Sequence, residues 1–152
     1  MNSVIVTTYN GKKYIKQQLV SILNQTLQPD EVLIYDDNST DNTVDIIKSF
    51  ISDNNLNNWK LTVRENNVGW RRNFIDASEK ASGKYIFFCD QDDVWMTRKL
   101  EIMSEIMENN KNILVLAGKY VKFYEDENAP EEDASYYNDK SVKKNTTRKK
   151  SI

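Results

Sequence analysis

The chain is constrained most by an apolar run that leads straight into acids. Residues 85–89 (YIFFC) are five apolar or aromatic residues, and Asp90-Gln91-Asp92-Asp93 follows at once. The run is too short for a globular helix and does not alternate, which predicts a strand buried on both faces of a parallel sheet. Ligands of open α/β sheets bind beyond the carboxyl ends of the strands, so these acids should face a crevice. Neighbouring carboxylates repel one another unless a cation lies between them, and an Asp-x-Asp at a strand end suits a metal–diphosphate site.

A purely structural role for these acids stays open at this point. Acidic residues at strand ends often form polar turns, and Asp93 could cap a helix that begins near Thr97. Short motifs match by chance too often to decide between the two interpretations. The rest of the chain has to decide.

Strand-like and helix-like segments alternate as far as residue 124. We expect strands at residues 4–8, 32–35, 61–63, 85–89 and 113–117. Helical spacing predicts helices from residue 12 to before Pro29, around 44–51, over 70–81 with Gly83 as an αL C-cap, and around 100–107. This alternation predicts an α/β fold with a mainly parallel sheet and helices on both faces. We expect one domain over residues 1–124 and a charged, flexible tail over 125–152.

Composition excludes several kinds of chemistry. The chain has no histidine and one cysteine, Cys89, so an ordinary zinc site, an internal disulfide and an imidazole triad are all excluded. A general base must therefore be a carboxylate, a lysine or a tyrosine. The first expected strand follows Met1 almost at once, with no basic signal segment and no long apolar span, which predicts a cytoplasmic protein. The acidic and basic blocks of the tail predict solvated chain, and no nucleic-acid partner is expected.

A second acidic cluster follows a second strand. Asp36-Asp37 and Asp41 come directly after the strand expected at residues 32–35. Because the carboxyl ends of parallel strands lie on one rim, Asp37 and Asp92 should face the same crevice. The two clusters together favour a ligand site over a set of turns.

Five stretches of the chain resemble the family 2 glycosyltransferases of the GT-A fold, inverting enzymes that use nucleoside-diphosphate sugars. In the order of that family, they are VIVTTYN at 4–10, SILNQT at 21–26, DDNSTDNT at 36–43, NVG at 67–69 and DQDDVW at 90–95. The resemblance covers about residues 3–118 and implies a GT-A, Rossmann-like fold. DQDDVW is most similar to rhamnosyltransferase-like members.

The resemblance implies a role for each matching position. Thr8 and Tyr9 would line the pocket for the nucleotide base, and Asp37 would accept a hydrogen bond from it. Asp90 would contact the ribose, and Asp92 would bind Mg²⁺ or Mn²⁺.

Other positions are less determined by the resemblance. Arg71 or Arg72 would meet the diphosphate of a UDP- or dTDP-linked donor, although a solvated helix charge explains either arginine equally well. Trp70 and Trp95 could stack on a sugar, or pack in the core or in a lid.

The activity implied is sugar transfer to a glycan or lipid-linked acceptor in surface polysaccharide synthesis, in the cytoplasm or at the inner face of the membrane. No catalytic base is identifiable, because Glu131, Glu132, Asp133 and Asp139 lie in the charged tail. The chain is then either the donor half of a longer enzyme, as a truncated fragment, or a nucleotide-sugar-binding module without turnover. Peripheral membrane association and self-association, through an apolar face left uncovered, both stay open.

A rival from another class uses the same acids. Residues 90–94 also fit the Asp-x-Asp nucleophile motif of haloacid-dehalogenase-like phosphatases. That fold normally begins with this motif and needs a later lysine and acidic pair. The only later candidates are in the charged tail, so this alternative is disfavoured.

Overall fold

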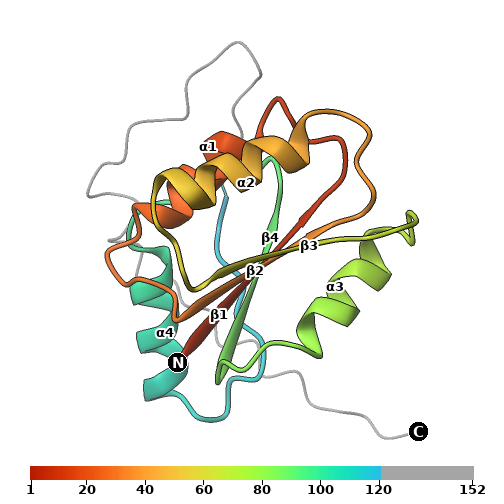
Figure 1. Ribbon diagram of the computed structural model, residues 1–152. Helices are drawn as coiled ribbons and strands as arrows, with labels where there is room; N and C mark the ends of the chain where they lie inside the picture. Colours follow the sequence, from red (N-terminus) through yellow and green to blue (C-terminus); the bar gives the residue numbers. More distant parts are fainter. Residues whose placement is uncertain (121–152) are drawn as a thin grey trace, which may run out of the picture. The chain divides into compact units, whose positions relative to one another are not determined.

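The computed structural model describes residues 1–120, in which four strands alternate with four helices (Figure 1). A compact unit spans Met1–Ser104, and a second unit begins at Glu105. The elements in chain order are β1 (Asn2–Thr8), α1 (Ile15–Leu23), β2 (Glu31–Asp36), α2 (Thr43–Asp53), β3 (Trp59–Val63), α3 (Trp70–Ser78), β4 (Tyr85–Asp90) and α4 (Lys99–Asn109). The predicted α/β fold with a parallel sheet is confirmed.

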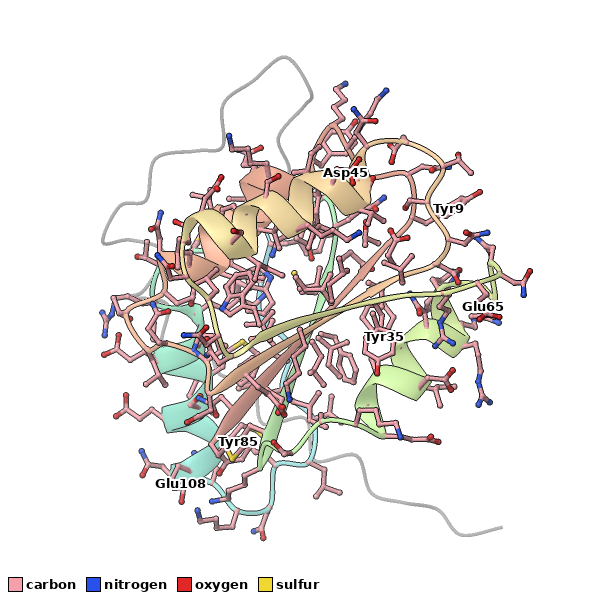
Figure 2. The ribbon with its side chains drawn as sticks, in the orientation of Figure 1. Tyr9, Tyr35, Asp45, Glu65, Tyr85 and Glu108 are labelled. Carbon is pink, nitrogen blue, oxygen red and sulfur yellow. The ribbon has the colours of Figure 1, made fainter. Side chains whose placement is uncertain are left out.

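Strand β1 is one of the two inner strands of the sheet, whose order is β3-β2-β1-β4. All its residues are buried, and it pairs in parallel with β2 on one side and with β4 on the other. In this register Thr8 is level with Asp36, and Thr7 is level with Asp90. Both acidic clusters therefore emerge at the same rim, as predicted. Figure 2 shows the two ends of the sheet, with Tyr9 at this rim and Tyr85 at the opposite one.

The core lies largely between the sheet and two helices. Ile15, Leu19 and Ile22 form the buried stripe of α1, at the spacing that brings side chains onto one helical face. α1 and α2 lie on one side of the sheet, and α3 lies on the other (Figure 1). The buried cluster comprises Val4, Val6, Ile15, Leu19, Ile22, Val32, Ile34, Ile47, Phe50, Trp59, Phe87, Cys89, Trp95 and Leu100.

Strand β4 corrects one prediction. It is not buried on both faces: Phe87 and Cys89 are buried, whereas Ile86 is 37% exposed and Phe88 is 55% exposed. The reason is its position at the edge of the sheet, where the described helices cover the second face only in part. Phe74 of α3 reaches Phe88 edge-on, with ring centroids 5.5 Å apart. An apolar surface therefore remains exposed here.

The strand predicted at residues 113–117 is also wrong. These residues form no strand, and Leu114 and Val115 are 83% and 87% exposed. An apolar run becomes a strand only when a neighbouring strand takes up its N–H and C=O groups. Residues 113–117 pair with none of the four described strands.

Helix α3 ends earlier than predicted, at Ser78, and Gly83 is not its αL C-cap. Gly83 is a site of close approach instead. A Cβ atom there would lie 2.4 Å from the Oγ of Ser3 and 2.5 Å from its backbone N. The glycine therefore lets the chain enter β4 directly beside the start of β1.

Residues 121–152 lie outside the described part of the chain. The expected domain boundary at 124 and the four acids weighed as bases fall there. No helix within residues 1–120 has the length and apolar character needed to cross a lipid bilayer.

Candidate functional site

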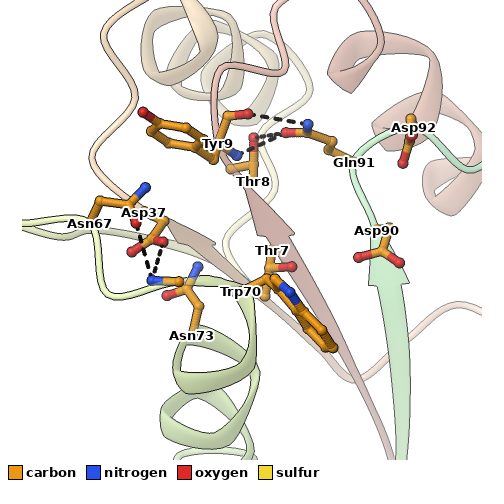
Figure 3. A pocket seen from close by; sticks show the side chains of 11 residues that line it. Thr7, Thr8, Tyr9, Asp37, Asn67, Trp70, Asn73, Asp90, Gln91 and Asp92 are labelled. Atoms are coloured by element: carbon orange, nitrogen blue, oxygen red, sulfur yellow. Dashed lines mark hydrogen bonds between the residues drawn. The ribbon is translucent and has the colours of Figure 1, made fainter.

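A pocket of about 340 Å³ opens at the rim where β1, β2 and β4 end (Figure 3). Five of the predicted site residues, Thr8, Tyr9, Asp37, Asp90 and Asp92, meet around it. They come from three strand ends that are distant in sequence. The other lining residues are Thr7, Asn67, Gly69, Trp70, Asn73 and Gln91.

The carboxylate of Asp37 is buried and fixes the loop that leads into α3. It accepts hydrogen bonds from the backbone N–H groups of Val68 and Gly69, each at 2.8 Å. Gly69 has φ +84°, a conformation that favours glycine, and it is the N-cap residue of α3. One acid thus anchors the loop that forms a wall of the pocket.

Asn73 was missed by the sequence reasoning, although it lines the pocket and is fully buried. Its side-chain amide donates to the carbonyl of Tyr35 at 2.8 Å, and its Oδ1 accepts from Arg64 at 2.6 Å. Arg64 also pairs with Asp76 at 2.7 Å. These bonds connect α3 to the ends of β2 and β3. A polar residue on the buried face of an amphipathic helix was the available signal.

Gln91 was also missed. Its Oε1 accepts from the hydroxyl of Thr8 at 2.9 Å and from the backbone N–H of Tyr9 at 2.8 Å. Its Nε2 donates to the carbonyl of Tyr9 at 3.2 Å. The signal in the sequence was a single neutral amide within a run of acids.

The other acids of the second cluster connect loops. Asp36 is fully buried and accepts from the N–H and hydroxyl of Ser39 at 2.8 and 2.5 Å. Asp41 accepts from the N–H of Thr43, the first residue of α2, and from the N–H of Lys12. Of this cluster, only Asp37 lines the pocket.

The acids after β4 are suited to a cation. The pKa of Asp90 is raised, first by burial and then by the negative charges of Asp93 and Asp92. A divalent ion would relieve this repulsion, and carboxylate oxygens are ligands that Mg²⁺ and Mn²⁺ prefer. Within residues 1–120, no three His, Cys, Asp or Glu side chains converge on one ion position. An ion here would therefore complete its coordination with water and phosphate oxygens, as Mg²⁺ usually does.

Helix α3 places the aromatic and basic candidates differently. Trp70 lines the pocket and is 64% exposed, and the guanidinium of Arg71 lies over its ring, 5.0 Å from the centroid. Arg71 is not a lining residue, and Arg72 pairs with Asp76 at 2.7 Å. Trp95 is buried in the core. The predicted contact of Arg71 with a diphosphate stays a prediction.

The sequence matches the model of the family described as Glycosyl transferase family 2 over residues 3–152. A curated relative from Escherichia coli, the UDP-Glc:alpha-D-GlcNAc-diphosphoundecaprenol beta-1,3-glucosyltransferase WfgD, is 36% identical over 118 residues. That alignment covers 78% of this chain and 45% of WfgD.

Solved structures show the same fold. The Staphylococcus aureus TarS structure with UDP-GlcNAc gives a TM-score of 0.66 at 31% identity, over 86% of this chain and 37% of that one. TarS is a poly(ribitol-phosphate) beta-N-acetylglucosaminyltransferase. The mannosyltransferase PcManGT from Pyrobaculum calidifontis, in complex with GDP-Man and Mn²⁺, gives 0.59 at 27% identity, over 64% of this chain and 29% of that one. The chain thus spans less than half the length of these relatives.

Proposed function

This chain belongs to glycosyl transferase family 2, and we propose that its pocket binds the UDP- or dTDP-linked sugar donor of an inverting, metal-dependent glycosyltransferase. The enzyme would build a bacterial surface polysaccharide or teichoic acid. One observation carries the proposal. The ends of β1 and β2 and the acidic motif after β4, all predicted to contact the donor, line a single pocket.

Two sides of the pocket would bind two parts of the donor. On one side Tyr9 offers an aromatic face for the base, and Asp37 offers a carboxylate. A carboxylate has about four lone-pair sites, so the two backbone N–H groups bound to Asp37 leave room for the N–H of a uracil or thymine. On the other side Asp90 would bind the ribose, and Asp92 would bind the metal. Arg71 would reach the diphosphate by swinging away from Trp70.

The bound Mg²⁺ or Mn²⁺ would neutralise the charge that develops on the departing nucleoside diphosphate. The lining residues would hold the donor with its sugar carbon open to the acceptor hydroxyl. In an inverting transfer that hydroxyl oxygen bonds to the sugar carbon, the bond to the diphosphate breaks, and a base takes the proton. Asp37, Asp90 and Asp92 are the carboxylates lining the pocket, and the donor complex engages all three. We therefore assign the base to none of the carboxylates that line this pocket.

The acceptor class is proposed from the relatives. WfgD is named for a lipid-linked acceptor, a sugar on diphosphoundecaprenol, and TarS for a poly(ribitol-phosphate). We propose a glycan on a lipid or polyol-phosphate carrier, which would bring the enzyme to the membrane surface where such acceptors lie.

A second function, binding of a nucleotide sugar without turnover, is favoured by the fact that the donor would engage all three pocket carboxylates. With no free carboxylate in the described pocket, the chain could bind a nucleotide sugar without turning it over. Binding assays do not separate the two functions, so transfer to a lipid-linked acceptor has to be measured as well. Transfer by the chain would exclude the binding-only function.

The deciding experiment is a calorimetric titration of the chain with UDP-glucose, UDP-GlcNAc, dTDP-rhamnose and GDP-mannose, each with and without Mn²⁺. dTDP-rhamnose tests the similarity of DQDDVW to rhamnosyltransferase-like members, and GDP-mannose is the purine control. We expect saturable binding of at least one uridine or thymidine donor, tightened by Mn²⁺. Saturable binding of none of the four would refute the donor site, and a preference for GDP-mannose would refute the pyrimidine assignment.

A further inference from the structure

The side chain of Gln91 makes hydrogen bonds of the kind that a backbone peptide group makes in a β-sheet. The backbone pairing of β1 with β4 ends at Thr7 and Asp90. One residue beyond the end of β4, the carboxamide of Gln91 accepts from the N–H of Tyr9 and donates to its C=O, at 2.8 and 3.2 Å. An amide side chain thus continues the ladder beyond the point where the backbones separate. It also accepts from the hydroxyl of Thr8 at 2.9 Å, so one carboxamide makes three hydrogen bonds to this loop.

Gly11 leaves the space that this carboxamide fills. A Cβ atom at Gly11 would lie 2.3 Å from Oε1 of Gln91 and 2.7 Å from its Cδ. Gly11 is not among the residues with positive φ, so its backbone would accept alanine. Its carbonyl accepts from the N–H groups of Tyr14 and Ile15, where α1 begins. The missing side chain therefore serves the packing of Gln91, not an unusual backbone conformation.

We infer that Gln91, packed against Gly11, is a positioning residue that couples the nucleotide-base side of the pocket to its acidic side. This inference rests on the proposed donor site. Gln91 lies between Asp90 and Asp92 in the chain, and its side chain bonds the hydroxyl of Thr8 and the backbone of Tyr9. A shift of the acids caused by a bound cation is transmitted to the loop that receives the base.

This coupling has a measurable form. If the base side and the acidic side share one rigid connection, Mn²⁺ tightens the binding of UDP by more than its own contact with the phosphates provides. Coupling between two sites typically changes affinity by about 5- to 150-fold. Loss of the carboxamide should reduce the Mn²⁺-dependent gain in UDP affinity by about tenfold. A residue that merely supports the fold would lower the active fraction and leave this gain unchanged.

The test is a double-mutant cycle of Gly11→Ala and Gln91→Ala, with the dissociation constant of UDP measured with and without Mn²⁺. In the parent chain Gly11→Ala displaces the carboxamide, so both single variants should lose about tenfold of the Mn²⁺-dependent gain. In the Gln91→Ala background the carboxamide is gone, and the new methyl group meets only the rotatable hydroxyl of Thr8, at 3.1 Å. Gly11→Ala should therefore cause little further loss of the Mn²⁺-dependent gain. Gly118→Ala and Gln28→Ala are matched controls, because Gly118 has open space around it and Gln28 bonds the carbonyls of Leu23 and Gln25.

Each outcome decides something. A parent chain that binds neither UDP nor dTDP refutes the proposed function, and with it the inference; if only dTDP binds, the cycle is run with dTDP. A parent chain that binds UDP, with both single variants keeping the full gain from Mn²⁺, refutes the inference alone. Additive losses in the double variant also refute it, because they would mean that Gly11 and Gln91 act independently. If Gly11→Ala does not fold, as judged by circular dichroism, Gln91→Ala against Gln28→Ala decides through the Mn²⁺-dependent gain.

Discussion

Replacing Asp37 with asparagine should loosen the loop that forms a wall of the pocket, even when no ligand is bound. The carboxylate accepts from two backbone N–H groups, those of Val68 and Gly69, each at 2.8 Å. Asparagine keeps one acceptor oxygen but turns an NH₂ group towards the second N–H. One charge-assisted hydrogen bond is worth about 1.5–3 kcal/mol, which corresponds to about 10- to 150-fold in an equilibrium constant. Gly69 has a second acceptor, Oδ1 of Asn67 at 3.2 Å, so we expect the lower end of this range.

The measurement is amide hydrogen exchange at Val68 and Gly69, together with the affinity for uridine. We expect about tenfold faster exchange at one or both amides and at least an equal loss of uridine affinity, with or without Mn²⁺. Asp53→Asn is the matched control, because Asp53 is exposed at the end of α2 and loses the same charge. Unchanged exchange in Asp37→Asn would refute the anchoring role. If uridine affinity still fell, Asp37 would act through the base alone.

Three further predictions test the acids and one glycine. Asp92→Asn should abolish most of the Mn²⁺ dependence of UDP binding and leave uridine binding unchanged, because it removes the charge of a metal ligand while keeping the shape of the side chain. Full retention of the Mn²⁺ dependence would contradict the metal assignment. Burial and the charges of Asp93 and Asp92 raise the pKa of Asp90 above its usual 3.8. The metal-free chain should therefore lose stability as the pH rises from 3.8 through the raised pKa, because the folded state then loses a proton that it binds more tightly than the unfolded state does. Stabilisation of the chain by Mn²⁺ should grow over the same pH range. Thermal melts of Asp90→Asn should lack this component, and an identical pH profile would refute it. Gly83→Ala should cost about 1–3 kcal/mol in urea unfolding, because its Cβ would overlap Ser3, whereas a cost as small as that of Gly118→Ala would mean that the backbone yields there.

The sheet and one half of the site could be predicted from local patterns. Strand runs that end in Asp36-Asp37 and Asp90-Gln91-Asp92 predict acids on one rim, since parallel strands fix which end of each strand lies there. The prediction needed only the direction of the strands, not their contacts.

The parts that were missed depend on contacts between distant residues. The role of Gln91 depends on Tyr9 and Gly11, about 80 positions away, and a neutral amide within a run of acids does not by itself indicate these partners. Residues 85–89 and 113–117 show a similar limit. An apolar run shows only that a segment is hydrophobic. Whether both faces of the segment are covered, and whether it pairs with another strand, depends on the elements that lie beside it in the fold.

The inner position of β1 has a consequence for how this site forms during folding. β1 is made well before β4, and the hydrogen bond between Thr8 and Gln91 at the pocket joins residues 83 positions apart. Strands β1, β2 and β3 can pair, and Asp37 can anchor Gly69, before β4 has docked. Closing so long a loop is entropically costly, and parallel pairing at long range is slow. The base side of the pocket should therefore form early on the ribosome, with one edge of β1 unpaired until the acidic motif emerges.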